Sequence, residues 1–187
     1  YIEFISRTSE IVKKYNKTLI GWDDIYLGDI PPNTVLQFWN YSQNEPCNKG
    51  LDNILNGLKK QPKVLVSPAA LMYLDMKYDS LTKLGLNWAG FIDVKKGYDW
   101  SIEKLFPEIP GDKIIGVEAP LWTETTSNSS ELEFLTLPRL PGYAEIGWTK
   151  TSLRDWSEYK HRLAKQSLIW RSKNINYYPS PLIQLEE

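Results

Sequence analysis

Four short apolar runs constrain the fold of this chain more than any other feature. They lie near residues 18–22, 34–39, 64–67 and 114–121, and helical patterns occur between and after them. Near-continuous apolar strands that alternate with helices are typical of parallel sheets built from βα units. Each run ends in polar or aromatic residues, which are Trp22-Asp23-Asp24, Trp39-Asn40, Ser67 and Trp122-Thr123-Glu124. Because the active site of a βα-barrel lies at the carboxyl ends of its strands, these residues are the first site candidates.

The helical patterns complete these units. Ile2, Ile5, Val12 and Tyr15 fall near one helical face, and Leu51, Ile54, Leu55 and Leu58 recur at helical spacing before Pro62. The stretch SSELEFLTLPRL predicts a helix with Ser129 or Ser130 as its N-cap, and a C-terminal helix is expected near 152–171. The expected fold class is therefore α/β, with about four parallel βα units and a C-terminal helix, which is half of a TIM (β/α)8 barrel.

The stretch GVEAPLWTE, residues 116–124, suggests what such a site could bind. If this run continues as a strand, Trp122 and Glu124 point to the same face, since side chains alternate along a strand. An indole beside a carboxylate suits a ligand with an apolar face and hydroxyl groups, and a sugar has both. The alternative for each Trp is an ordinary core position, because Trp buries a large area.

Composition and charge exclude several classes of function. The chain has 187 residues, a net charge of −1 and no basic patch, so nucleic acid is not an expected partner. No apolar run approaches the roughly 18 residues of a membrane span, and no signal peptide is recognisable, although a targeting segment removed before Tyr1 is left open. Cys47 and His161 are each alone, which disfavours a disulfide, a metal site and Cys–His or serine-hydrolase chemistry. We expect no metal and no cofactor.

A series of motifs, in order along nearly the whole chain, resembles the C-terminal half of the catalytic barrel of family 20 glycoside hydrolases, the β-N-acetylhexosaminidases. The motifs are GWDDI (21–25), LQFWN (36–40), SPAALMYLDM (67–76), NWAG with YDW (87–90 and 98–100), APLWTE (119–124), LPRLPGYAEIGWT (137–149) and NYYPSP (176–181). Any one of them is weak, but their common order and spacing make the resemblance strong. It implies that residues 1–187 are one half of the barrel and that the N-terminal half is absent.

The resemblance implies a substrate-assisted retaining mechanism, in which the 2-acetamido oxygen of the substrate attacks C1 and forms an oxazolinium intermediate. Family 20 is an exception among retaining glycosidases, which mostly use an enzyme carboxylate for that step. The expected activity is exo-hydrolysis of terminal β-linked N-acetylglucosamine or N-acetylgalactosamine. A glycan or glycoconjugate that carries such a sugar is the expected partner.

The resemblance also assigns roles to individual residues. Tyr73, the expected catalytic residue of this chain, would donate a hydrogen bond to the acetamido oxygen, and Asp75 and Glu124 would accept hydrogen bonds from sugar hydroxyls. The indoles of Trp22, Trp39 and Trp122 would form an apolar box around the acetamido methyl group, and Trp88 would line the entrance. For Asp75 the competing interpretation is a turn or N-cap residue, and for Glu124 a solvated loop end.

Other polar residues are expected to be structural. Asp23 and Asp24 stand where the family carries an Asp-Glu pair that is not part of the pocket, and we interpret them as hydrogen-bonding groups at the strand end. Arg139 and Glu145 are expected to form a buried ion pair that supports the barrel.

One departure from the family limits what this chain can do. The family's acid/base pair is an Asp-Glu dipeptide in an H-x-G-G-D-E motif, and this sequence contains no Asp-Glu dipeptide. The chain would then supply a sugar pocket and be inactive alone. The alternatives are a non-catalytic sugar-binding fragment, a structural half-barrel and a lacto-N-biosidase-type relative. A half-barrel has open sheet edges, so we expect a dimer or pairing with the missing half. An extracytoplasmic location is implied by the family alone.

Overall fold

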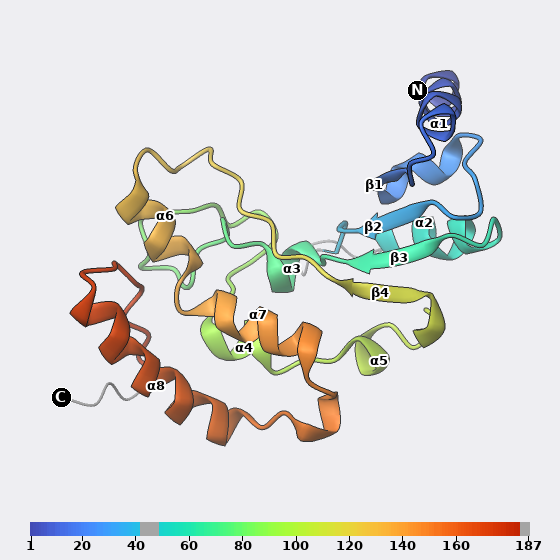
Figure 1. Ribbon diagram of the computed structural model, residues 1–187. Coiled ribbons are helices and arrows are strands. Elements are labelled where there is room, and N and C mark those ends of the chain that lie inside the picture. The colour runs from blue at the N-terminus through green and yellow to red at the C-terminus, as the bar shows by residue number, and fades with distance from the viewer. Residues whose placement is uncertain (42–48, 184–187) are drawn as a thin grey trace. The chain divides into compact units, whose positions relative to one another are not determined.

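The computed structural model describes residues 1–41 and 49–183 (Figure 1). Cys47, singled out from the sequence, lies outside the described residues. The chain divides into two compact units, which are described in turn. The first unit contains Tyr1–Ala69 and Ile102–Glu118, and the second contains Ala70–Ser101 and Ala119–Glu187.

The first unit is built on a four-stranded parallel sheet with the strand order β1-β2-β3-β4. The strands are β1 (Ile20–Trp22), β2 (Val35–Phe38), β3 (Lys63–Val66) and β4 (Ile114–Val117). Gly21 is paired with Leu36, and Leu36 is paired with Val64, so the register is continuous across the first three strands. The register shifts once, between Val64 and Leu65, where β4 is added. The predicted set of parallel strands is confirmed.

The fourth strand is shorter than the sequence suggested. β4 ends at Val117 rather than near residue 121, and the last ladder bond is donated by the Glu118 N–H to the Val66 carbonyl. Pro120 has no N–H with which to continue the ladder. Trp122 and Glu124 therefore lie beyond the strand, and the expectation that strand alternation puts them on one face is wrong.

The described part of the first unit also contains three helices. They are α1 (Ile2–Lys14), α2 (Lys49–Leu58) and α5 (Ile102–Leu105), with short 3₁₀ turns η1 (Asp23–Leu27) and η2 (Gly111–Lys113). The predicted helix before Pro62 is confirmed, and it packs against β2 through the fully buried Ile54. In α1 only part of the predicted face is buried, since Ile5 is inside whereas Ile2 and Tyr15 are exposed.

The second unit is helical, with long irregular connections. It holds α3 (Ala69–Met72, which begins at the last residue of the first unit), α4 (Val94–Tyr98), α6 (Ser129–Thr136), α7 (Arg139–Trp148), η3 (Thr151–Leu153) and α8 (Trp156–Ser172). Its aromatic core contains two stacked tyrosine pairs, Tyr78 with Tyr178 and Tyr98 with Tyr159, each with ring centroids 4.0 Å apart. The C-terminal helix is confirmed.

Two local predictions for the second unit are wrong. The N-cap of α6 is Asn128, whose side-chain oxygen accepts from the Glu131 N–H at 3.0 Å, rather than Ser129 or Ser130. Arg139 and Glu145 do not pair, because a separation of six residues on α7 puts their side chains about 120° apart around the helix. Glu145 instead accepts from Arg162 on α8, at 2.6 Å and 2.8 Å.

No helix in the described part of the chain is both long enough and apolar enough to cross a membrane.

The start of α2 is packed tightly against the end of β2, which provides a test of the fold. A Cβ added at Gly50 would overlap the backbone carbonyl oxygen of Asn40 and lie 2.8 Å from a ring carbon of Phe38. Overpacking of this kind costs about 1–3 kcal/mol. We therefore expect Gly50→Ala to lower the free energy of unfolding by about 1–3 kcal/mol, measured by urea denaturation.

Gly111→Ala is the matched control, since a Cβ at that position meets nothing within 4 Å. Its free energy of unfolding should stay within about 0.5 kcal/mol of the parent. Equal stability of the two variants would contradict the packing described for α2.

Candidate functional site

The first unit brings two of the predicted residues together. Trp22 is the last residue of β1 and Trp39 follows β2 directly, so both lie at carboxyl ends of neighbouring strands. Their ring centroids are 6.4 Å apart, with an interplanar angle of 77°. Both side chains are half-buried. The parallel register thus assembles an edge-to-face indole pair from residues 17 positions apart.

Asp23 holds this pair in place. Its carboxylate is fully buried and accepts from Asn53 Nδ2 at 2.8 Å and from the Trp39 N–H at 3.4 Å. Burial raises the pKa of Asp23 to about 6, and the hydrogen bond from Asn53 opposes that rise. Asp24 is exposed and accepts from the same Asn53 amide at 3.1 Å. The structural interpretation of both aspartates agrees with these contacts.

The second unit contains a cluster of three aromatic side chains around Tyr73. The Tyr73 ring lies 5.9 Å from the Trp88 ring, at 83°, and 6.4 Å from the Trp122 ring, at 50°. Tyr73 is buried, whereas Trp88 and Trp122 are 43% and 41% exposed. The Leu74 N–H donates to the Pro120 carbonyl at 2.8 Å, which ties the Tyr73 segment to the Trp122 segment. The cluster offers broad aromatic surface to a ligand around a buried phenol.

Asp75 lies next to this cluster and is the most unusual polar residue in the unit. It is 1% exposed, and neither carboxylate oxygen has a hydrogen-bond partner of good geometry among the described residues. Burial raises the pKa of Asp75 to about 6. The backbone N–H groups of Asp75 and Trp122 oppose this rise, the charge of Glu124 adds to it, and the charge of Arg139 opposes it. A buried acceptor without a partner costs free energy until a donor reaches it.

The remaining predicted residue, Glu124, is exposed in the turn that follows Trp122. Its negative charge adds to the rise in the pKa of Asp75 that burial causes. The seven residues expected from the sequence thus form two groups, one in each unit. The first group is Trp22 with Trp39, and the second is Tyr73, Asp75, Trp88, Trp122 and Glu124.

Sequence reasoning missed a polar network in the first unit. Gln37, in β2, is buried, and its Nε2 donates to Ser67 Oγ at 3.1 Å and to Glu118 Oε1 at 2.7 Å. Ser67 follows β3 and Glu118 follows β4, so one amide joins three neighbouring strands at their carboxyl ends. The signal that could have revealed it is a glutamine in the middle of the apolar run TVLQFWN.

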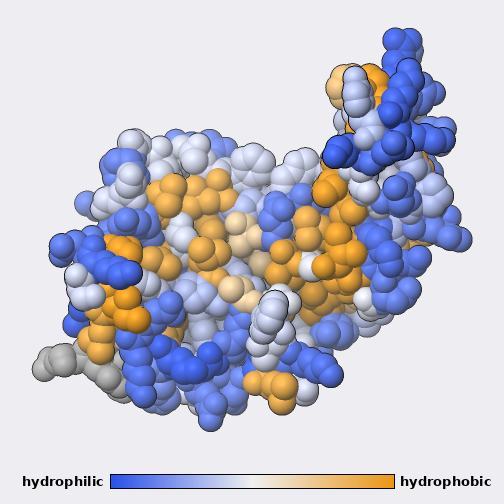
Figure 2. Space-filling model, viewed as in Figure 1, coloured by the Kyte–Doolittle hydropathy of each residue, from blue (hydrophilic) through white to orange (hydrophobic). Residues whose placement is uncertain are grey.

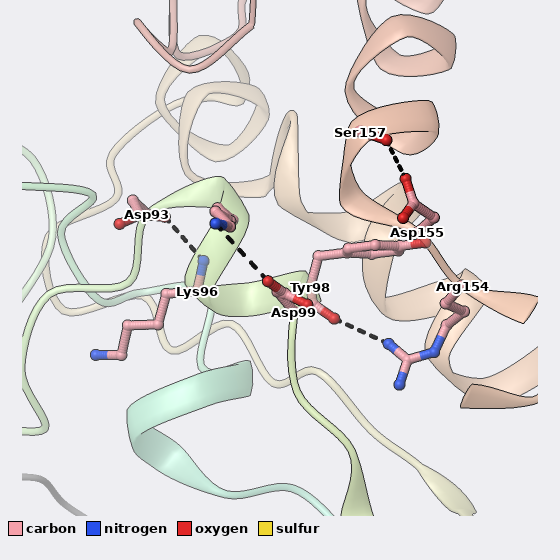
Figure 3. A network of polar contacts seen from close by, with 8 residues as sticks. Asp93, Lys96, Tyr98, Asp99, Arg154, Asp155 and Ser157 are labelled. Carbon is pink, nitrogen blue, oxygen red and sulfur yellow. Dashed lines mark hydrogen bonds and ion pairs between the residues drawn. The ribbon is translucent and has the colours of Figure 1, made fainter. Parts of the chain in front are cut away.

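A second polar network in the second unit is structural. Arg154 donates to the Tyr98 carbonyl at 2.8 Å, and Asp93 caps α4 by accepting from the Lys96 N–H at 2.8 Å (Figure 3). Arg154 also donates to the Trp100 carbonyl, at 2.5 Å. Asp155 caps α8 in the same way, accepting from the Glu158 N–H at 3.0 Å. These contacts join helix termini and irregular backbone. Within residues 1–41 and 49–183, no group of three or more His, Cys, Asp or Glu side chains could hold a metal ion.

Comparison with known proteins places this arrangement in a family. The family model "Glycosyl hydrolase family 20, catalytic domain" matches residues 1–151. A β-N-acetylhexosaminidase from Cellulomonas fimi is 35% identical over 183 residues, which are 98% of this chain and 36% of that protein. A β-hexosaminidase from Porphyromonas gingivalis is 26% identical over 179 residues, which are 94% of this chain and 22% of that protein.

Solved structures support the same family assignment. The family 20 β-N-acetylhexosaminidase from Streptomyces coelicolor A3(2) has a TM-score of 0.92 and 38% identity, over 99% of this chain and 37% of that one. A mutant β-hexosaminidase from Streptomyces plicatus, solved with its product GlcNAc, gives the same values. The chain therefore spans between about a fifth and little more than a third of the length of these relatives, which agrees with half of a (β/α)8 barrel. From the family model, the sequence identities and the shared fold together, we conclude that this chain belongs to glycoside hydrolase family 20.

Proposed function

We propose that this chain supplies the sugar-holding part of a β-N-acetylhexosaminidase, and that the intact protein removes terminal β-linked N-acetylglucosamine or N-acetylgalactosamine. The observation that carries the proposal is the buried carboxylate of Asp75, unpartnered among the described residues, beside the aromatic cluster of Tyr73 and Trp122. A sugar offers hydroxyl donors to the carboxylate and an apolar C–H face to the aromatic rings.

In the proposed mechanism the substrate provides its own nucleophile. Its acetamido oxygen attacks C1 as the C1–O glycosidic bond breaks, and the departing oxygen takes a proton from the general acid of the intact protein. Water then opens the resulting oxazolinium intermediate with retention of configuration. Tyr73 donates its hydroxyl hydrogen to the acetamido oxygen and holds it in line with C1, since a fixed near-attack geometry raises the rate. Tyr73 acts as a donor in this step and takes no proton from the substrate.

The other residues bind the sugar. Asp75 and Glu124 accept hydrogen bonds from its hydroxyls, because a hydrogen bond to an ionised acceptor is roughly twice as strong as a neutral one. The indole of Trp122 provides apolar surface for the ring face of the sugar, and Trp88 contacts the group that leaves. By family resemblance, Trp22 and Trp39 of the first unit provide apolar surface for an acetamido methyl group. The half-exposed faces of Trp88 and Trp122 support these roles.

The proton for the leaving group has no source in this proposal among the 187 residues, since the sequence contains no Asp-Glu dipeptide. We infer that the acid/base pair belongs to another part of the intact protein, which also completes the barrel. Loss of a general acid costs about 10²–10⁴ in rate. By family resemblance we also propose that the intact protein works outside the cytoplasm.

The function is tested by binding and turnover together. We expect the chain to bind N-acetylglucosamine in a calorimetric titration and to release no p-nitrophenol from the corresponding N-acetylglucosaminide. Trp122→Ala should weaken binding about tenfold or more, because it removes one aromatic wall. Trp148→Ala is the matched control, since Trp148 is 92% exposed and lies outside both groups of predicted residues; its affinity should stay within about twofold of the parent.

Each result decides between the readings. Turnover by the isolated chain would contradict the missing acid, and equal affinity of the two Trp variants would contradict the role of Trp122. If the chain binds neither N-acetylglucosamine nor N-acetylgalactosamine, the alternative of a structural half-barrel is favoured. Preference for a disaccharide would favour a lacto-N-biosidase-type relative.

Asp75 gives the chain a characteristic pH dependence. The folded chain holds the Asp75 proton up to about pH 6, whereas the unfolded chain releases it near pH 3.8. The contribution of this group to stability is therefore complete below pH 3.8 and is lost as the pH rises through 6. We expect Asp75→Asn to raise the free energy of unfolding at pH 7.5 and to change it little at pH 4, measured by urea denaturation.

Asp23→Asn is the control for this experiment. Asp23 has a similar pKa of about 6, but its oxygens already accept hydrogen bonds from Asn53 and from the Trp39 N–H. An asparagine there loses one acceptor, so it should not stabilise the chain at pH 7.5. An equal change in stability for Asp75→Asn at both pH values would show that its carboxylate is not desolvated as described.

We further propose that the chain pairs through its sheet, with a second copy or with the rest of the barrel. Within the described residues, β1 and β4 each pair on one side only, and Ile20 and Ile115 on them are more than half exposed. Figure 2 shows hydrophobic side chains gathered over the strands of this unit. Open strand edges of this kind favour association.

Pairing is tested by light scattering over a range of concentrations. We expect the chain to associate, and Ile20→Lys to shift it toward monomer, because lysine on an edge strand opposes pairing. Leu153→Lys, at an exposed position that belongs to the second unit and not to a strand, should leave association unchanged. A monomer at every concentration, or the same shift for both variants, would count against the proposal.

A further inference from the structure

The guanidinium of Arg139 is the largest polar group that is fully buried in the second unit. Arg139 is the first residue of α7, is 1% exposed, and forms no ion pair within the described residues. Its Cζ lies 3.9 Å from the centre of the Tyr78 ring. A buried charge needs hydrogen-bond partners to offset its loss of hydration, so the partners of this group reveal what it holds.

All of its hydrogen bonds that the structure gives go to backbone carbonyls. Nη2 donates to Leu74 at 2.6 Å and to Leu135 at 2.9 Å, and Nη1 donates to Met76 at 2.8 Å and to Ile92 at 3.1 Å. Leu74 and Met76 are the two neighbours of Asp75 in the chain, and Leu74 also follows Tyr73. One planar side chain therefore fixes the backbone on both sides of Asp75.

Arg139 forms these hydrogen bonds where regular secondary structure is absent. α3 ends at Met72, and residues 73–76 are held otherwise by the Leu74 N–H donating to Pro120 and by the Leu86 N–H donating to the Asp75 carbonyl. The side chains that we propose to contact the sugar project from this segment, so their directions depend on its backbone. In addition, the charge of Arg139 favours the ionised form of Asp75, which is the better acceptor.

We propose that Arg139 is a positioning residue for sugar binding, which holds the Tyr73–Met76 backbone so that the Tyr73 hydroxyl and the Asp75 carboxylate meet an N-acetylhexosamine together. This proposal rests on the proposed function. Arg139 touches no substrate atom in it and acts through Tyr73 and Asp75. Lysine cannot replace it, because an ammonium group lacks the planar fork that reaches carbonyls on both sides of Asp75.

The test variant is Arg139→Lys, which keeps the charge and loses the fork. Arg154→Lys is the matched control, because Arg154 also donates to two backbone carbonyls in the same unit, that of Tyr98 (Figure 3) and that of Trp100. The readouts are the affinity for N-acetylglucosamine, the midpoint of thermal unfolding, and the pKa of the Asp75 carboxyl group measured by carbon NMR.

We expect Arg139→Lys to bind N-acetylglucosamine at least tenfold more weakly and Arg154→Lys to stay within twofold of the parent, at comparable losses of thermal stability. In an Asp75→Asn background, Arg139→Lys should cost less than it does alone, because part of its effect acts through Asp75. Equal affinity losses for the two lysine variants, or full additivity with Asp75→Asn, would overturn the proposal.

The NMR readout separates this proposal from the proposed function. If the parent chain binds no sugar, the proposed function of this chain fails, but an Asp75 pKa that moves in Arg139→Lys and is unchanged in Arg154→Lys still supports the positioning role. If Arg139→Lys does not fold, Tyr78→Leu removes the ring stacked on the guanidinium while retaining the arginine, and a smaller loss of affinity is expected. Failure of both variants to fold would make Arg139 a stability residue and overturn the proposal.

Discussion

The irregular backbone of the second unit depends on two guanidinium groups, that of the buried Arg139 and that of the half-buried Arg154. Residues 73–93, between α3 and α4, form no helix and no strand of the sheet, so the carbonyls of this stretch need other donors. Arg139 serves four carbonyls and Arg154 serves two. Each guanidinium also lies over a tyrosine ring, Arg139 over Tyr78 and Arg154 over Tyr98. Arginine suits this use because its donors are fixed in one plane and its charge is weakly hydrated.

The same irregular segment contains the buried carboxylate of Asp75, which lowers the stability of the folded chain. Burial of a carboxylate without a partner destabilises the folded chain at neutral pH, and its neighbours offset only part of that cost. Functional sites commonly retain groups that a stable core would exclude, since binding requires acceptors that are not already occupied. Asp23 differs from Asp75 in its contacts. Its pKa is similar, but its oxygens accept hydrogen bonds from Asn53 and from the Trp39 N–H.

The sequence predicted the sheet well because each of the four strands corresponds to one of the four apolar runs. Parallel strands can also be recognised without turn residues. It did not predict α7, since the helix predicted over SSELEFLTLPRL includes only Arg139 and Leu140 of α7, which continues through Pro141 and Gly142. Proline is tolerated in the first turn of a helix, since its missing N–H would have had no partner there. The pairing of Arg139 with Glu145 was inferred from charge alone, which ignores helix geometry. The motifs identified the family, but the burial of Asp75 and the contacts of Arg139 depend on tertiary structure that no local pattern encodes.

The amide of Gln37 has a consequence for how the sheet is aligned. β4 joins the sheet after a long excursion of the chain from β3, and its register with β3 is irregular. A slip of β2 by one residue would turn Gln37 to the opposite face and leave Ser67 and Glu118 without their shared donor. A single side chain therefore penalises misalignment of three strands at once. β4 is held in the sheet by this polar contact as well as by its backbone hydrogen bonds.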